Sequence, residues 1–207
     1  MPKKIPPSFY FIGNHPALDF INTKIAADGK LLDLLGSFHD VMQWLVLAKL
    51  FSQEQIDDVS QGWAREDCES AVGTAAALRH SMLTIVQRGM RHEDIPEEDI
   101  ERVNSILCEQ VFTTRLFWDG QAFAAARETA VRQPADLLIP VAEAAVDLFT
   151  NYDLGLIKKC ENPDCVLHFY DNSKNSTRRW CSQKTCGNRM KVAAFLERRK
   201  NNGSEQP

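Results

Sequence analysis

The stretch Cys160-Glu-Asn-Pro-Asp-Cys165 and, after fifteen intervening residues, the stretch Cys181-Ser-Gln-Lys-Thr-Cys186 decide how the last third of this chain folds. Two close cysteine pairs separated by a short span can surround one zinc ion, which takes four ligands tetrahedrally and suits thiolates. The Asn-Pro-Asp triplet at 162–164 is typical of a tight turn between the first two cysteines. The pattern therefore predicts one structural Zn²⁺ bound by Cys160, Cys165, Cys181 and Cys186.

Two other uses of the same thiols follow from cysteine chemistry. A disulfide framework requires an oxidising compartment, but residues 1–7 lack the apolar run of a secretion signal. A redox sensor remains an open alternative, because a zinc-bound thiolate can be oxidised and lose its metal. The remaining cysteines, Cys68 and Cys108, stand alone in helical patterns, and we expect them to be packed or simply reduced.

The charge of the chain is divided unevenly along its length. Residues 158–200 contain 11 Lys and Arg against 4 Asp and Glu, a net charge of +7. The whole chain has a net charge of −4, so the remainder carries −11. A basic module beside an acidic body attracts a polyanion through one end and repels it from the other, and this indicates nucleic acid as a partner.

Two further motifs carry a resemblance to known families. Arg-Arg-Trp-Cys-Ser at 178–182, followed by Cys-Gly-Asn-Arg at 186–189, resembles the signature of the CGNR zinc-finger family. Gly-Asn-His-Pro-Ala-Leu-Asp-Phe-Ile-Asn-Thr at 13–23 is similar to the opening of the ABATE domain, which accompanies that finger in bacterial proteins regarded as stress-induced transcription regulators. The resemblance implies a bacterial regulator that binds double-stranded DNA and has a helical input domain.

Length and composition set the domain plan. A chain of 207 residues with 44% hydrophobic content can bury one core of roughly 150 residues plus a small module that needs its metal to fold. We expect a mainly helical ABATE-like domain at 1–152, a CGNR-type finger at 153–200 and a disordered tail at 201–207. The longest apolar runs are shorter than the roughly 18 residues of a membrane span, which predicts a cytoplasmic protein without a membrane partner.

The predicted fold is mainly α with small β elements. Sequences of the capping-box type begin at Ser37 and Ser52, each ahead of an apolar segment. Asp119-Gly120 lies between two short runs that favour strands, and it predicts a tight hairpin. Apolar residues recur at helical spacing in four stretches, at 16–25, 66–91, 96–111 and 134–150.

Within the finger, residues 166–170 favour a strand, and residues 178–180 are its expected antiparallel partner. A helix is predicted over 187–199. Its apolar residues are expected to pack toward that hairpin, and they are Met190, Ala193, Ala194 and Leu196.

The nucleic-acid surface is predicted from side-chain chemistry. Six cations can neutralise phosphates: Arg178, Arg179, Lys184, Lys191, Arg198 and Arg199. Asn188 and Arg189 can read base edges, although supporting a zinc thiolate or a turn is the stronger interpretation for Asn188. An RNA-binding or protein-interaction module is the alternative, and strand preference separates it from a DNA regulator. A zinc shell of four cysteines is closed, and the chain lacks a phosphate-binding loop, so we expect no enzyme activity.

The N-terminal motif is the predicted input site. His15, Asp19 and Asn22 place an imidazole, a carboxylate and an amide within a few helical positions, enough to bind a small polar molecule or a peptide. Structural uses compete with this interpretation, because Asp19 can pair with a buried arginine such as Arg79 and Asn22 can cap the helix end. A homodimer is also expected, because a single small finger reads few base pairs.

Overall fold

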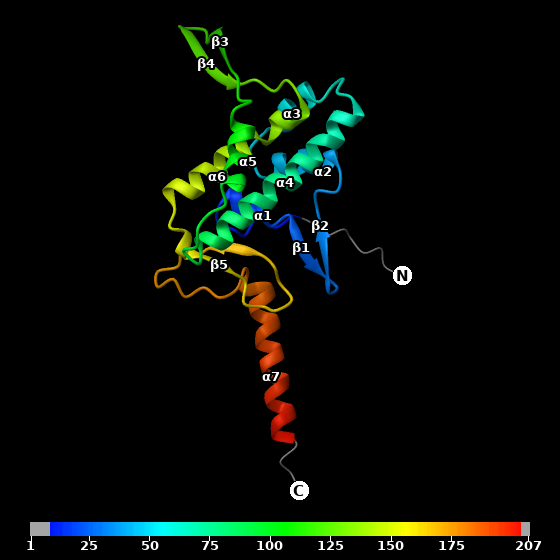
Figure 1. Ribbon diagram of the computed structural model, residues 1–207, viewed down its shortest axis with the longest axis vertical. Helices are drawn as coiled ribbons and strands as arrows, with labels where there is room; N and C mark the ends of the chain where they lie inside the picture. Colours follow the sequence, from blue (N-terminus) through cyan, green and yellow to red (C-terminus); the bar gives the residue numbers. More distant parts are fainter. Residues whose placement is uncertain (1–8, 204–207) are drawn as a thin grey trace.

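The computed structural model describes residues 9–203 of the chain, which form a mainly helical body with a finger at its C-terminal end (Figure 1). The body and finger elements follow in chain order: α1 (Pro16–Ile21), β1 (Lys24–Ala27), β2 (Lys30–Asp33), α2 (Phe38–Leu47), α3 (Gln53–Val59), α4 (Arg65–Gly89), α5 (Glu97–Leu107), β3 (Phe112–Trp118), β4 (Phe123–Thr129), η1 (Pro134–Leu138), α6 (Ile139–Asn151), η2 (Leu154–Leu156), β5 (Ile157–Lys159), β6 (His168–Tyr170), η3 (Gln183–Gly187) and α7 (Asn188–Gly203). The fold is therefore mainly α with small antiparallel sheets, as predicted.

The local signals for helix starts are confirmed. Ser37 caps α2 by accepting a hydrogen bond from the backbone N–H of Asp40, and Ser52 forms a complete capping box with Gln55 at the start of α3. The predicted N-terminal helix is shorter than its apolar spacing suggested. It ends at Ile21, and Ile25 lies in β1 because the chain reverses there into the β1–β2 hairpin.

The hydrophobic core lies between α1, α2, α4 and α6. Its largest fully buried side chains include Phe20, Trp44, Leu78 and Leu148. Burial of side chains of this size contributes about 1.5–3 kcal/mol each, so this core holds α1 firmly against α4 and α6. The position of α1 matters for function because its flanking residues hold the finger.

Two elements project from opposite ends of the molecule (Figure 1). The hairpin β3–β4 stands at the top of the figure, and its Asp119-Gly120 turn is confirmed: Gly120 has φ +102° and Asp119 accepts hydrogen bonds from the backbone N–H groups of Gln121 and Ala122. At the lower end, α7 extends away from the finger. Among residues 9–203, no helix is both long and apolar enough to cross a membrane.

The strand pairing predicted for the finger is wrong. β6 pairs antiparallel with β5, so that Ile157 lies opposite Tyr170, and residues 178–180 form no strand. The backbone N–H of Arg178 instead donates to the carboxylate of Asp171, and the carbonyl of Arg179 accepts from Glu161 N–H. The side chain of Asp171 therefore takes the hydrogen bond that the predicted pairing with β6 would have given to Arg178.

The predicted packing of α7 is also wrong. Its side chains from Lys191 to Arg199 are all exposed, including Ala193, Ala194 and Leu196, and Met190 is only half-buried. The principal contacts of the helix are with the preceding turn, η3. The helix continues to Gly203, into the segment expected to be a tail, and residues 204–207 lie outside the described residues.

Candidate metal centre and nucleic-acid surface

The four predicted ligands meet at one point. The sulfur atoms of Cys160, Cys165, Cys181 and Cys186 all lie within 4.8 Å of one another, and all four residues are buried. The Sγ atoms of Cys165 and Cys181 are 3.8 Å apart, and those of Cys181 and Cys186 are 3.5 Å apart. A tetrahedral zinc with Zn–S bonds of about 2.3 Å places its sulfurs about 3.8 Å apart, so the cluster fits that ion.

Hydrogen bonds link the sulfur atoms of the cluster to one another and to nearby N–H groups. The hydrogen bond from Cys181 lowers the pKa of Cys165 to about 5, whereas burial raises the pKa of Cys160 and the bond to Cys165 raises the pKa of Cys181. The backbone N–H of Cys181 lies 3.3 Å from Cys160 Sγ, and the amide nitrogen of Asn162 lies 3.3 Å from Cys186 Sγ. Ionised, hydrogen-bonded sulfurs are the form that zinc binds. His168 lies outside this cluster.

Comparison with known protein families agrees with this geometry. Residues 157–199 match the family model described as CGNR zinc finger, and residues 14–152 match the ABATE model, described as "Putative stress-induced transcription regulator". The second match covers more than half of the chain. The chain belongs to the ABATE family. No curated protein matches this ABATE protein.

The CGNR finger of this ABATE protein therefore holds one structural zinc ion through its four cysteines. When bound, the ion cross-links two loops that have little apolar core of their own. Of the residues that the structure describes, only Ile25, Leu167 and Phe169 join the cysteines in the buried cluster at this end of the molecule. The metal is consequently the main source of stability for the finger.

The predicted input motif joins the body to the finger. Asn22 donates to the carbonyl of His168 and accepts from its backbone N–H, both at 2.8 Å, and Asn22 is 1% exposed. The backbone N–H of Tyr170 donates to the carbonyl of Gly13 at 2.8 Å, and the amide of Asn14 donates to the carbonyl of Tyr170. We call this contact between residues 13–22 and β6 the body–finger interface.

His15 and Asp19 also form bonds within the protein. His15 caps α1 through Nδ1, which accepts from Ala17 N–H, and its Nε2 lies 3.0 Å from a carboxylate oxygen of Asp147. Asp19 accepts from the backbone N–H groups of Ile12 and Gly13, at 2.9 and 2.7 Å. Burial raises the pKa of Asp19 to about 6 despite these two bonds.

Asp19 does not pair with Arg79, as one sequence interpretation suggested. Arg79 is buried and forms a bidentate pair with Asp33 at the end of β2, and it also donates to Thr23. The carboxylate of Asp19 instead accepts from backbone N–H groups just before α1. Asn22 thus contacts the finger directly, whereas Asp19 holds the backbone of Ile12 and Gly13 beside that contact.

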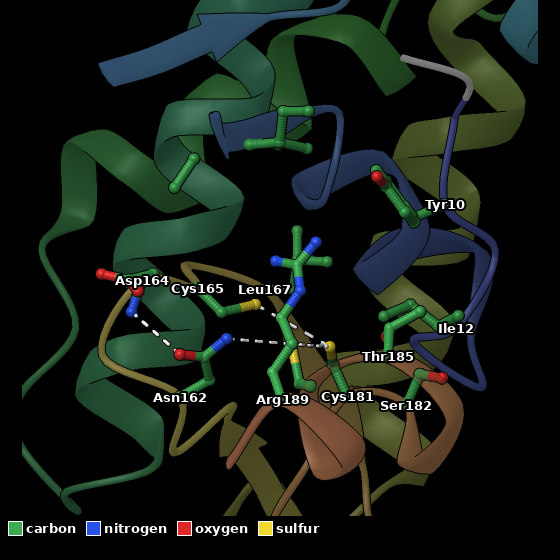
Figure 2. A pocket seen from close by; sticks show the side chains of 13 residues that line it. Tyr10, Ile12, Asn162, Asp164, Cys165, Leu167, Cys181, Ser182, Thr185 and Arg189 are labelled. Carbon is green, nitrogen blue, oxygen red and sulfur yellow. Dashed lines mark hydrogen bonds between the residues drawn. The ribbon is translucent and has the colours of Figure 1, made fainter. Parts of the chain in front are cut away.

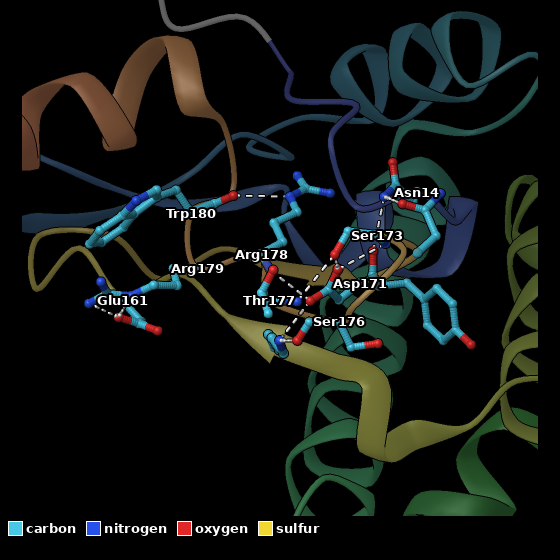
Figure 3. Close-up of polar contacts among 12 residues, drawn as sticks. Asn14, Glu161, Asp171, Ser173, Ser176, Thr177, Arg178, Arg179 and Trp180 are labelled. Atoms are coloured by element: carbon cyan, nitrogen blue, oxygen red, sulfur yellow. Dashed lines mark hydrogen bonds and ion pairs between the residues drawn. The ribbon is translucent and has the colours of Figure 1, made fainter.

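Two of the predicted phosphate-binding arginines are engaged inside the finger (Figure 3). The guanidinium of Arg178 donates to the carbonyls of Ile12, Trp180 and Cys181, and it stacks 4.0 Å above the ring of Phe169. Arg179 forms an ion pair with Glu161 at 2.6 Å. Arg178 is consequently a structural residue that joins the finger to Ile12 of the body, next to the body–finger interface.

A buried carboxylate organises the loop beside these arginines (Figure 3). Burial alone would raise the pKa of Asp171, but hydrogen bonds from Lys158, Ser173 and the backbone of Arg178 hold it far below its ordinary value. Asp171 therefore stays ionised and fixes the 171–178 loop. This role of Asp171 was not predicted, although an acidic residue followed two positions later by serine is a recognisable turn signal.

The remaining residues of the predicted nucleic-acid surface lie on the outside. Lys184, Asn188, Arg189, Lys191, Arg198 and Arg199 are all exposed, on η3 and α7. The amide of Asn188 donates to the carbonyl of Lys184, so it supports the turn into α7 and makes no bond to a thiolate. Asn162 has that role, and its position between two cysteines was the signal that could have identified it.

A pocket of about 240 Å³ opens beside the metal centre (Figure 2). The body contributes Tyr10, Ile12, Ile25 and Ala26 to its wall, and the finger contributes Asn162, Asp164, Leu167, Ser182, Thr185 and Arg189 together with three of the cysteines. A molecule bound here would contact both parts of the protein.

Proposed function

We propose that this ABATE protein is a transcription regulator that binds double-stranded DNA through α7 and the zinc-supported turn before it. The observation that carries the proposal is that α7 is exposed along its length and presents four cations against one carboxylate among its described side chains: Arg189, Lys191, Arg198, Arg199 and Glu197. A cationic helix whose side chains are exposed from Lys191 to Arg199 can approach a phosphate backbone without displacing other contacts.

The arrangement of side chains around α7 supports a helix that enters a groove. Val192, Phe195 and Leu196 lie on one side because residues three and four positions apart share a helical face. Lys191 and Arg198, seven positions apart, flank this apolar stripe on one side, and Arg189 flanks it on the other. Cations on both flanks can reach the two phosphate walls of a major groove, while apolar side chains contact thymine methyl groups.

The zinc site gives this helix a fixed base. η3 contains Cys186, so the ion holds the residue that precedes Asn188 and Arg189 by two and three positions. Arg178 and Asn22 then tie the finger to the body. We therefore assign DNA contact to Lys184, Arg189, Lys191, Arg198 and Arg199, and positioning of the finger to Arg178. Arg179, paired with Glu161, is a secondary phosphate contact.

We assign signal input to the pocket of Figure 2. The earlier candidates, His15, Asp19 and Asn22, make hydrogen bonds within the protein, whereas the pocket combines an apolar wall with two exposed charged residues, Arg189 and Asp164. A small molecule with an apolar part and a polar group that bonds to both side chains suits this lining. Because Arg189 belongs to both the pocket and α7, such a ligand would compete with DNA for that side chain. The closed four-cysteine site and the regulator families together favour a non-enzymatic role.

A protein-interaction module is the second candidate. The stripe of Val192, Phe195 and Leu196 is 58%, 53% and 52% exposed, and an amphipathic helix of this kind can dock into a groove of another protein. The DNA proposal predicts that cations dominate binding, whereas this alternative predicts that the apolar stripe does.

The test is a fluorescence-anisotropy titration of zinc-loaded protein against random duplex DNA, single-stranded DNA and structured RNA. We expect duplex DNA to bind most tightly and its affinity to fall as salt rises. Preference for single strands or RNA would favour an RNA-binding module, and absence of binding to all three at low salt would contradict the proposal. Phe195→Ala is the matched variant for the protein-interaction alternative.

A further inference from the structure

The hairpin β3–β4 stands apart from the helical body (Figure 1). It is a two-stranded sheet, and within residues 9–203 neither strand pairs with any other strand. Its two ends are joined by further bonds, because Ala130 N–H donates to the carbonyl of Val111 and Arg132 donates to the carbonyl of Glu109. A two-stranded hairpin with nothing packed on it is marginal in water, so seven paired residues in each strand point to a missing partner.

One face of this hairpin is mainly apolar, and its polar residues are Thr114, Arg127 and Thr129. The register places Trp118 opposite Phe123 and Leu116 opposite Ala125, and side chains two positions apart share a face. Phe112, Leu116, Trp118 and Phe123 therefore lie on the same side, and they are 45%, 67%, 57% and 73% exposed. Soluble monomers rarely leave a contiguous surface of this kind open to water. We call these four residues, with Ala125, the hairpin face.

The hairpin face is complementary to itself. Leu116 lies opposite Ala125, so a large apolar side chain stands beside a small one on this face. In a two-fold interface residue i of one copy meets residue j of the other, and the reverse contact follows by symmetry. Leu116 of one copy can thus lie over Ala125 of the second copy, with its own Ala125 covered in return.

The charge of the hairpin also suits a second copy. Residues 112–129 contain Arg115, Arg127, Asp119 and Glu128, so their net charge is zero. Arg127 stacks 3.8 Å above Phe112, where it covers one end of the face. Two neutral hairpins can approach without repulsion, whereas a polyanion or an anionic membrane gains little from a neutral element on an acidic body. Two α7 helices, both cationic, would repel each other.

We propose that the hairpin face is a self-association surface that packs against the same face of a second copy about a two-fold axis. The exposed parts of its three aromatic side chains and Leu116 amount to roughly 500 Å² per copy. Two copies then bury about 1,000 Å², the lower limit for a specific interface, which predicts a weak and reversible dimer. This inference goes beyond DNA binding and does not depend on it.

The test is sedimentation equilibrium of the full-length, zinc-loaded protein without nucleic acid, at a series of concentrations. The wild-type chain is compared with Leu116→Glu, which places a charge at the centre of the face. Leu47→Glu is the matched control, because Leu47 is 51% exposed on α2, outside the hairpin. Circular dichroism and zinc content establish that both variants are folded.

We expect a concentration-dependent dimer in the wild type and in Leu47→Glu, and at least about ten-fold weaker association in Leu116→Glu. A wild-type protein that stays monomeric throughout would overturn the proposal. A dimer that is equally stable in Leu116→Glu would overturn it as well, because the interface would then lie elsewhere. Both outcomes are independent of whether the protein binds DNA.

Discussion

The two sides of the finger use the same kinds of residue in opposite ways. On the side that faces the body, the guanidinium of Arg178 donates to three carbonyls and stacks on one aromatic ring. The side chain of Asn22 hydrogen-bonds to both the backbone N–H and the carbonyl of His168. On the outer side, Arg189 and Lys191 are exposed on a projecting helix. Paired groups fix the position of the finger, whereas unpaired charges remain available for a partner. The role of a cation in a motif therefore depends on its neighbours and not on its residue type.

Removal of zinc should have the largest effect, because it affects both sides at once. Metal binding contributes about 10–16 kcal/mol in comparable fingers, so chelation or Cys186→Ser should unfold residues 157–199 and abolish DNA binding. Hydrogen exchange measures this directly, and the helical body should keep its protection. Cys108→Ser, at an exposed cysteine outside the cluster, is the control and should change neither property.

Substitution of Asn22 should weaken only the body–finger interface. Asn22→Ala leaves the buried N–H and carbonyl of His168 without partners, which costs about 2–4 kcal/mol. Denaturant unfolding measures the loss, while zinc content should remain normal. Asn104→Ala is the matched control, since the side chain of Asn104 bonds to Glu101 on the surface of α5. Equal stability of the two variants would contradict the importance of the body–finger interface.

The titration of Asp19 should have the smallest effect on stability. The folded pKa is about 6 against an ordinary value of 3.8, so the folded state binds this proton more tightly. The corresponding stability is present below about pH 4 and is lost as the pH rises through 6. Asp19→Asn should therefore gain stability relative to wild type between pH 4 and 7, by about 1 kcal/mol after allowance for solvent screening.

Asp147→Asn should change stability in the opposite direction to Asp19→Asn. Hydrogen bonds from Asn151 and His15 lower the pKa of Asp147, so its contribution is present above its ordinary pKa and lost as the pH falls. The variant should lose stability relative to wild type at neutral pH. If both variants gained stability, or both lost it, the opposite pKa shifts of Asp19 and Asp147 would be contradicted.

The sequence predicted those features that depend on neighbouring residues. The caps at Ser37 and Ser52, the turn at Asp119-Gly120 and the four zinc ligands are local patterns with few alternatives. The partner of β6 was not predictable, because β5 and residues 178–180 are both plausible by composition. The choice depends on Asp171, which binds the backbone of Arg178. The exposure of α7 was missed for a similar reason: a helix with apolar residues was expected to find a surface within its own chain.

The most direct test of the central claim is the salt dependence of duplex binding by two double variants with the same change in charge. Arg189→Ala/Lys191→Ala removes two cations from α7, and Arg65→Ala/Arg91→Ala removes two exposed cations from the body. We predict that only the α7 variant binds more weakly and that its slope of log affinity against log salt decreases in magnitude by about 2. Equal loss in both variants, or no loss in either, would contradict the assignment of DNA contact to α7.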